Sequence, residues 1–223
     1  MSPSDQIALS RQRPGTATYQ KGRATAAAIL EKARRIVIEH GMHALTLRRI
    51  AREMNMSPGN LNYYYASKSD LISDLLTSFI EPYLQEMERL REQRQGEPIE
   101  QLRAVLKFIF EDLENRETTY FFPELWALAL RHDWAEQKME WMYGTYRSVL
   151  TDIITELRPE LEKRSIEDMA LTISASIEGH TVFIGRDRSH QDRAPFVGAL
   201  IIEQLVDLAV SGQPITGQAT NAA

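Results

Sequence analysis

The stretch that decides the fold runs from Thr46 to Lys68 and reads TLRRIAREMNMSPGNLNYYYASK. Apolar residues recur in its first half at spacings of three and four, the period of an α-helix. Thr46 precedes that run and predicts its N-cap, since a threonine hydroxyl can accept a hydrogen bond from a free first-turn amide. Ser57 and Pro58 predict a second cap and a second helix start, because proline is tolerated at the first helical position. Two short helices joined by a tight turn form a helix-turn-helix, whose second helix enters the DNA major groove.

The second helix, expected over residues 58–64, carries side chains that suit contact with DNA. Gly59 leaves little bulk near a phosphate, and Asn60 and Asn62 can donate to and accept from base edges. The consecutive tyrosines at 63–65 cannot all be buried, because successive helical residues point about 100° apart. An outward tyrosine offers its hydroxyl to a phosphate. The residues expected to contact DNA are Thr46, Ser57, Gly59, Asn60, Asn62, Tyr63, Tyr64 and Lys68.

These residues resemble the DNA-binding domain of the TetR family of bacterial repressors over about residues 22–76. The family pattern is roughly T-L-x-x-I-A followed by S-x-G-x-L-Y-x-H-F-x-x-K-x-x-L. The chain departs from it at Asn62, where the family usually has tyrosine, at Tyr64, where histidine is common, and at Tyr65, which replaces phenylalanine. Asn62 should therefore alter which bases are read. The matching positions are Thr46, Leu47, Ile50, Ala51, Ser57, Gly59, Leu61, Lys68 and Leu71.

Composition bounds the class of protein. The 223 residues are 43% hydrophobic with a net charge of −5, which is ordinary for a soluble globular chain of one large or two modest domains. The absence of cysteine excludes disulfides and cysteine-ligated zinc and fits a reducing cytoplasm. No run of 18 apolar residues and no signal-peptide stretch is present. We therefore expect a cytoplasmic protein without a membrane partner.

Charge is distributed unevenly along the chain. Residues 1–70 hold 11 Lys and Arg against five Asp and Glu, a balance of +6 that leaves −11 for the remainder. A basic N-terminal third on an acidic body indicates that only the first part meets nucleic acid, although a chance imbalance of solvated faces is the alternative. Arg11, Arg13, Lys21 and Arg23 could follow DNA phosphates, or form part of a solvated tail.

The helical periodicity predicts an all-α fold. We expect an N-terminal three-helix domain containing the helix-turn-helix and a C-terminal helical domain for ligand binding and dimerisation. The expected boundaries are 1–20 for a disordered arm, 21–67 for the DNA-binding domain, 68–211 for the second domain and 212–223 for a disordered tail. Further helices are expected over about 23–40, 68–95, 99–115, 119–132, 134–157, 166–185 and 195–211.

Aromatic residues are concentrated between positions 120 and 146, where eight of the chain's 18 aromatics and all its tryptophans lie. Aromatic and methionine side chains line adaptable apolar cavities, and an acid among them would favour a cation, while an uncharged ligand is equally compatible. Plain core packing or a dimer contact is the alternative for any single residue. The expected ligand-binding residues are Tyr120, Phe121, Trp126, Trp134, Met139, Met142, Tyr146 and Glu178.

The last two helices are expected to form a dimer interface. The helix over 195–211 is apolar around much of its circumference and needs cover on more than one side. The resemblance supplies that cover, because it implies a homodimer in which residues 166–185 and 195–211 pair with their copies. Cover from within the same monomer is the alternative.

Together these features predict a homodimeric repressor that binds a pseudo-palindromic operator and is released by an unknown small-molecule effector. Three alternatives stay open: an activator or corepressor-dependent regulator, a DNA-binding protein without a small-molecule ligand, and a helical enzyme or metal protein. No catalytic residue, cofactor or metal site is expected, since the chain has no Glu-x-x-His pair, no cysteine and no Gly-rich phosphate loop. His40 and His43 have no evident third metal ligand, and Ser57 and Ser67 have no plausible adjacent base.

Overall fold

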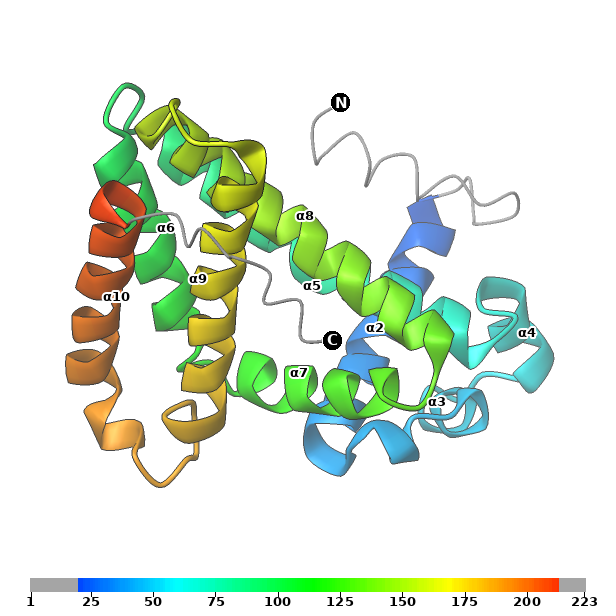
Figure 1. Ribbon diagram of the computed structural model, residues 1–223. Helices are drawn as coiled ribbons and strands as arrows, with labels where there is room; N and C mark the ends of the chain where they lie inside the picture. Colours follow the sequence, from blue (N-terminus) through cyan, green and yellow to red (C-terminus); the bar gives the residue numbers. More distant parts are fainter. Residues whose placement is uncertain (1–19, 213–223) are drawn as a thin grey trace, which may run out of the picture. The chain divides into compact units, whose positions relative to one another are not determined.

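The computed structural model describes residues 20–212, which form helices and no strand (Figure 1). The all-α expectation is confirmed for this part of the chain. Most of the arm at 1–20, with Arg11 and Arg13, and the tail beyond residue 212 lie outside the described residues. In chain order the elements are α2 (Gln20–His40), η1 (Met42–Ala44), α3 (Leu47–Glu53), α4 (Pro58–Tyr64), α5 (Lys68–Glu92), α6 (Pro98–Asp112), α7 (Arg116–Ala129), α8 (Asp133–Leu157), α9 (Lys163–Phe183), η2 (Gln191–Arg193) and α10 (Ala194–Ser211).

The two helices of the helix-turn-helix begin at the caps expected from the sequence. The Thr46 hydroxyl accepts a hydrogen bond from the Arg49 amide at 3.1 Å, and the Ser57 hydroxyl accepts one from the Asn60 amide at 3.2 Å. Asn55, in the turn between α3 and α4, has a φ of 53°, a left-handed conformation that asparagine tolerates better than most residues. Local side-chain chemistry therefore sets where α3 ends and where α4 starts.

The chain forms two compact units, residues 20–86 with 116–146 and residues 87–115 with 147–212. Helices α5 and α8 contribute residues to both units. The expected domains, a DNA-binding domain at 21–67 and a second domain at 68–211, were divided by their roles and not by compact packing. That division stays a prediction.

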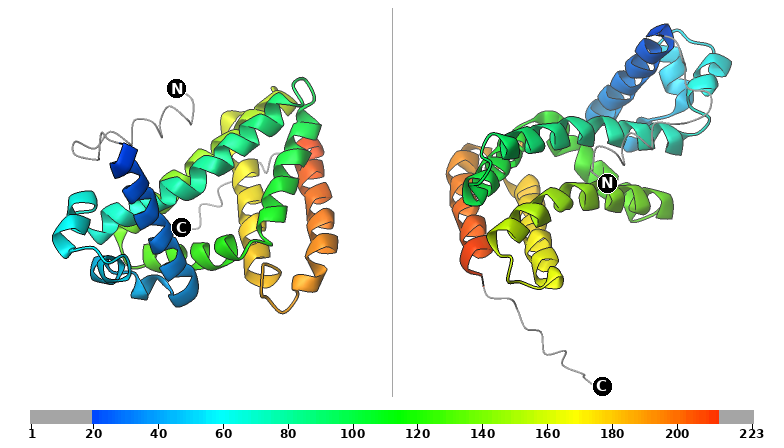
Figure 2. Two further views of the ribbon diagram at one scale, coloured as in Figure 1. Left: turned by 180° about the vertical axis from the view of Figure 1, so that it is seen from behind. Right: turned by 90° about the horizontal axis from the view of Figure 1, so that it is seen from above.

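The first unit joins α2, α3 and α4 to most of α5, to the first part of α8 and to α7, which passes beside α2 (Figures 1 and 2). Helix α2 turns one stripe inward, where Ile29, Ala33, Ile36 and Val37 are all buried. Phe121 of α7 is fully buried and stacks on Phe79 of α5, with ring centroids 4.2 Å apart. Helix α7 is thus part of the same core as the helix-turn-helix.

The second unit packs α10 against α6, with α9 beside them (Figure 1). Residues 191–211 have the length and apolar composition of a membrane-crossing helix. Their inner face belongs to the protein core, since Ile202, Leu205, Val206 and Ala209 are buried. Phe196, Leu200 and Val210 of the same helix are exposed.

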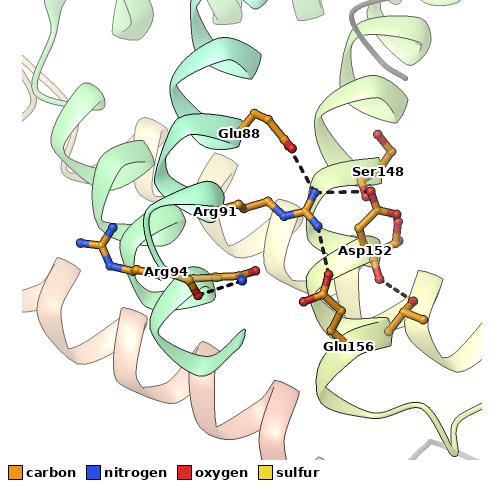
Figure 3. A network of polar contacts seen from close by, with 9 residues as sticks. Glu88, Arg91, Arg94, Ser148, Asp152 and Glu156 are labelled. Atoms are coloured by element: carbon orange, nitrogen blue, oxygen red, sulfur yellow. Dashed lines mark hydrogen bonds and ion pairs between the residues drawn. The ribbon is translucent and has the colours of Figure 1, made fainter. Parts of the chain in front are cut away.

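One ion-pair network connects the end of α5 to α8 within the second unit (Figure 3). The Arg91 guanidinium lies 3.3 Å from a carboxylate oxygen of Glu88, 3.6 Å from one of Asp152 and 3.3 Å from one of Glu156. One cation therefore balances three acids on two helices.

Candidate nucleic-acid interface

Helix α4 has one buried and one solvent-facing side. Leu61 is fully buried and holds the inner side, as does Tyr65 directly after the helix. Tyr63 is exposed, and its ring meets the half-buried ring of Tyr64 edge-on at 5.4 Å. Of the eight residues predicted to contact DNA, six are exposed: Thr46, Ser57, Gly59, Asn60, Asn62 and Tyr63. These six form a polar surface over the start of α3 and the length of α4.

Gly59 lies on the open side of this surface. Apart from its two chain neighbours and the backbone of α4 itself, a methyl group built at its α-carbon would meet no atom within 4 Å. The interior of the protein therefore does not require glycine at this position, and the backbone at the start of α4 is bare toward the solvent.

Lys68 differs from the other predicted DNA contacts. It is half-buried, and its ammonium donates a hydrogen bond to the Met42 carbonyl of η1 at 2.9 Å. Partial burial, which penalises the charged form, lowers the pKa of Lys68 below its usual value. Its charge is already engaged inside the protein, and contact with a DNA phosphate stays a prediction.

Helix α3 presents two arginines that the sequence argument did not include among the DNA contacts. Arg48 and Arg52 are exposed and form no ion pair within residues 20–212. Arg49 between them donates to Glu53 at 2.7 Å, and this hydrogen bond lowers the pKa of the Glu53 carboxyl. The spacing of four between Arg48 and Arg52 places both on one side of the helix, a signal that could have identified them.

The predicted ligand-binding residues fall in both units. Seven lie on α7 and α8 in the first unit, and Glu178 lies on α9 in the second. Three of the seven are buried, namely Phe121, Met142 and Tyr146. Phe121 packs on Phe79, so its environment in the structure is that of a core residue. Tyr120, Trp126, Trp134 and Met139 are half-buried.

A polar contact between α7 and α8 lies within this group. The Trp126 indole donates a hydrogen bond to the Tyr143 hydroxyl at 2.8 Å, and the Tyr143 and Tyr146 rings lie 6.5 Å apart. Tyr143 was not among the predicted ligand-binding residues, although it lies three positions before Tyr146 on the same helix. Trp134 stacks at 6.1 Å on His132. The structure thus brings Trp126 together with Tyr143 and Tyr146.

In the second unit, α9 and α10, the two helices expected to dimerise, carry exposed large apolar side chains. A groove of about 360 Å³ lies there, lined by Ser176, Gly179, His180, Phe183, Ile184, Ile201, Gln204 and Leu205. His180 is itself buried, with the Phe110 ring edge-on at 4.8 Å. The exposed large apolar residues of these helices are Leu171, Val182, Phe183, Phe196, Leu200 and Val210.

The chain is similar to known regulators in both halves. A family model described as bacterial regulatory proteins of the tetR family matches residues 29–75, and one described as the C-terminal part of BetI-type transcriptional repressors matches residues 98–207. An uncharacterized helix-turn-helix regulator from the dhlA 5′ region of Xanthobacter autotrophicus is 27% identical over 161 residues, which are 69% of this chain and 76% of that protein.

Solved structures share the fold. A TetR transcription regulator from Haloarcula marismortui is 17% identical, with a TM-score of 0.66 over 83% of this chain and 97% of its own. FadR from Bacillus subtilis, in complex with stearoyl-CoA, is 22% identical, with a TM-score of 0.60 over 84% of this chain and 98% of its own. With its DNA-binding helices and its C-terminal helices both matched, the chain belongs to the TetR family of transcriptional regulators.

Proposed function

We propose that this regulator is a homodimeric repressor, which binds a pseudo-palindromic operator and leaves it when a small molecule binds. The observation that carries the proposal is the polar outer side of α4, where Asn60, Asn62 and Tyr63 are exposed over a buried Leu61. The side-chain amides of asparagine can form hydrogen bonds with base edges in the major groove. An outer side of α4 that served only to solvate the helix would not require such amides. The proposed base and phosphate contacts are Thr46, Ser57, Gly59, Asn60, Asn62, Tyr63 and Tyr64, with Arg48 and Arg52 added as phosphate contacts.

The dimer is proposed to form through residues 166–185 and 195–211. The exposed Leu171 and Phe183 of α9 and Phe196 and Leu200 of α10 support it, since these large apolar side chains are available for a protein contact. A two-fold axis would present two copies of α4 to the DNA. Half-sites about 34–36 Å apart, one helical turn, or a multiple of that distance, would accept them.

Release by an effector is proposed to act through α7 and α8, where Trp126, Tyr143 and Tyr146 come together. Their aromatic character suits an apolar or cationic ligand. The coupling between effector and operator is reciprocal, and a coupling of roughly 1–3 kcal/mol changes each affinity about 5–150-fold. The protein is proposed to act in the cytoplasm, without catalysis or a cofactor, as the family and its regulators suggest.

Selection of bound duplexes from a random DNA pool at moderate salt tests the proposal. The expected result is a two-fold-symmetric enriched site, bound by a dimer in analytical ultracentrifugation. Salt-sensitive binding without any enrichment would contradict an unliganded repressor, and repeating the selection with cell extract metabolites would identify a corepressor-dependent regulator. A protein that stays monomeric on its selected site would overturn the proposed dimer.

A further inference from the structure

Helix α7 carries a longitudinal stripe of three side chains, at positions 117, 121 and 124, that contact α2, α5 and the turn before α3. Glu117 pairs with Arg34 of α2 at 3.2 Å, and Phe121 stacks on Phe79 of α5. Glu124 reaches the turn between α2 and α3. Spacings of four and three place these side chains on the same side of a helix. The stripe ends at the turn from which the helix-turn-helix begins.

The Glu124 carboxylate binds a main-chain group there. Its Oε2 accepts a hydrogen bond from the Met42 amide at 2.7 Å. Hydrogen bonds to a carboxylate are charge-assisted, and they are shorter and stronger than those between neutral groups. The carbonyl of the same residue accepts from the Lys68 ammonium at 2.9 Å. Both polar main-chain groups of Met42 are therefore held by charged side chains from other helices.

These residues flank the helix-turn-helix along the chain. Met42 lies just before α3, and Lys68 is the first residue of α5, just after α4. The bond between them ties together the two ends of the helix-turn-helix segment, residues 47–64. Glu124 then ties that closed segment to α7. We call the three residues Glu124, Met42 and Lys68 the clamp.

The turn is shaped to admit the carboxylate. Gly41 has a φ of 79°, which disfavours any residue with a side chain. A methyl group built on Gly41 would lie 3.1 Å from Oε1 of Glu124. Glycine thus serves both the backbone conformation and the close approach of Glu124. A carboxylate that merely lay on the surface would not need this space.

We infer that Glu124 is a positioning residue through which the DNA-binding helices sense the state of α7. The inference rests on the proposed function, because it specifies how an effector bound at α7 and α8 would reach the operator-binding surface. Trp126 lies two positions after Glu124 on α7 and is bonded to Tyr143 of α8. A ligand that displaces Trp126 moves the helix that carries Glu124, and the clamp passes this movement to both ends of the helix-turn-helix.

The test compares Glu124→Ala with Glu117→Ala in the full-length protein. Glu117→Ala is the matched control, since it removes an ion pair from the same stripe without touching Met42. The duplex obtained by selection serves as the operator, and a scrambled duplex measures non-specific binding. Glu124→Ala is expected to weaken operator binding at least about fivefold, the low end of allosteric couplings, and to leave non-specific binding unchanged. An equal effect of the two substitutions on the operator would overturn the inference.

Hydrogen exchange of the Met42 amide gives a readout that needs no operator specificity. Exchange is expected to be faster in Glu124→Ala than in the wild type and unchanged in Glu117→Ala. Operator binding should slow this exchange in the wild type and not in Glu124→Ala. An amide that exchanges equally in all three proteins would overturn the clamp itself. If the wild type selects no operator while its Met42 amide behaves as expected, the proposed function fails and the clamp stands.

Lys68→Met tests the clamp from its other end, and it also serves if Glu124→Ala does not fold. A positioning role predicts weaker operator binding with an unchanged salt dependence of non-specific binding. A direct phosphate contact predicts instead a salt slope lowered by about one. That second result would assign Lys68 to the DNA and would count against the clamp.

Discussion

Tyr63 and Tyr65 lie two positions apart at the end of α4, and their side chains are 64% and 2% exposed. The buried ring fills the core of the first unit, so Tyr65→Ala is expected to lower the free energy of unfolding by about 3–5 kcal/mol. Tyr63→Ala should change it by less than about 0.5 kcal/mol, as for surface substitutions, and should weaken operator binding. Urea denaturation and titration with the selected duplex measure the two effects. Comparable losses of stability in both variants would contradict the assignment.

Asn62 is exposed on α4, at the position where the TetR pattern quoted above has tyrosine. Its amide can form two hydrogen bonds with adenine, which tyrosine cannot do. Asn62→Ala should therefore relax the preference at one operator position by about 1–3 kcal/mol and leave the other positions as they are. Repeating the duplex selection with the variant measures this. Uniform weakening at every position would show that Asn62 only orients the protein.

The three arginines of α3 should differ in their effect on DNA binding. Arg48 and Arg52 are exposed and unpaired within the described residues, so replacing either by alanine should lower the salt slope of binding by about one. Arg49 is bonded to Glu53, and Arg49→Ala should leave the slope unchanged while removing that ion pair. Binding measured over a range of salt concentrations separates the two classes. Equal slopes for all three variants would show that the pairing of Arg49 is irrelevant to DNA binding.

Arg91 balances the acids Glu88, Asp152 and Glu156 in the second unit (Figure 3). Arg91→Met should lower the free energy of unfolding by about 1 kcal/mol, because a network holds its charges better than an isolated surface pair and the substitution leaves three acids close together. The melting temperature should fall by about 2–4 °C at low salt, and by less at high salt, which screens the repulsion. Lys107→Met removes an exposed pair with Glu111 and is the control, expected to have no measurable effect.

His180 should make the folded protein sensitive to mild acid. Burial lowers the pKa of this imidazole below its ordinary value of 6.5, so the unfolded chain binds the proton more readily than the folded one. The resulting stability is present above about pH 6.5 and is lost as the pH falls through the lower folded-state pKa. His180→Leu should flatten the acid side of the stability profile, measured by urea midpoints between pH 7.5 and pH 5. A wild-type profile that His180→Leu leaves unaltered would exclude this imidazole as the cause.

Local chemistry made α4 predictable to the residue. Ser57 and Pro58 mark its start within the sequence, and the structure has the helix over Pro58–Tyr64 as expected. The helix expected over about 23–40 was predictable for a similar reason, since helical periodicity needs no knowledge of distant residues. Both features depend on contacts between residues a few positions apart.

Contacts between distant segments could not be predicted in the same way. Composition placed Phe121 and Trp126 in one aromatic group, but only the fold shows that Phe121 packs on Phe79 while Trp126 bonds Tyr143. Lys68 and Met42 are 26 positions apart, so no helical period relates them. The arginines of α3 cannot be told apart by residue type. Only the folded helix shows that Arg49 reaches Glu53 while Arg48 and Arg52 do not.

The bare α-carbon of Gly59 has a consequence for how this protein can evolve. Glycine within a helix costs about 1 kcal/mol relative to alanine, and here no neighbouring atom stands in the way of a methyl group. Gly59→Ala should therefore raise the free energy of unfolding, so a laboratory selection for thermal resistance should find this substitution readily. If the position serves close approach to a phosphate, the more stable protein will bind its operator less tightly. Thermal stability and regulation would then compete at this one residue.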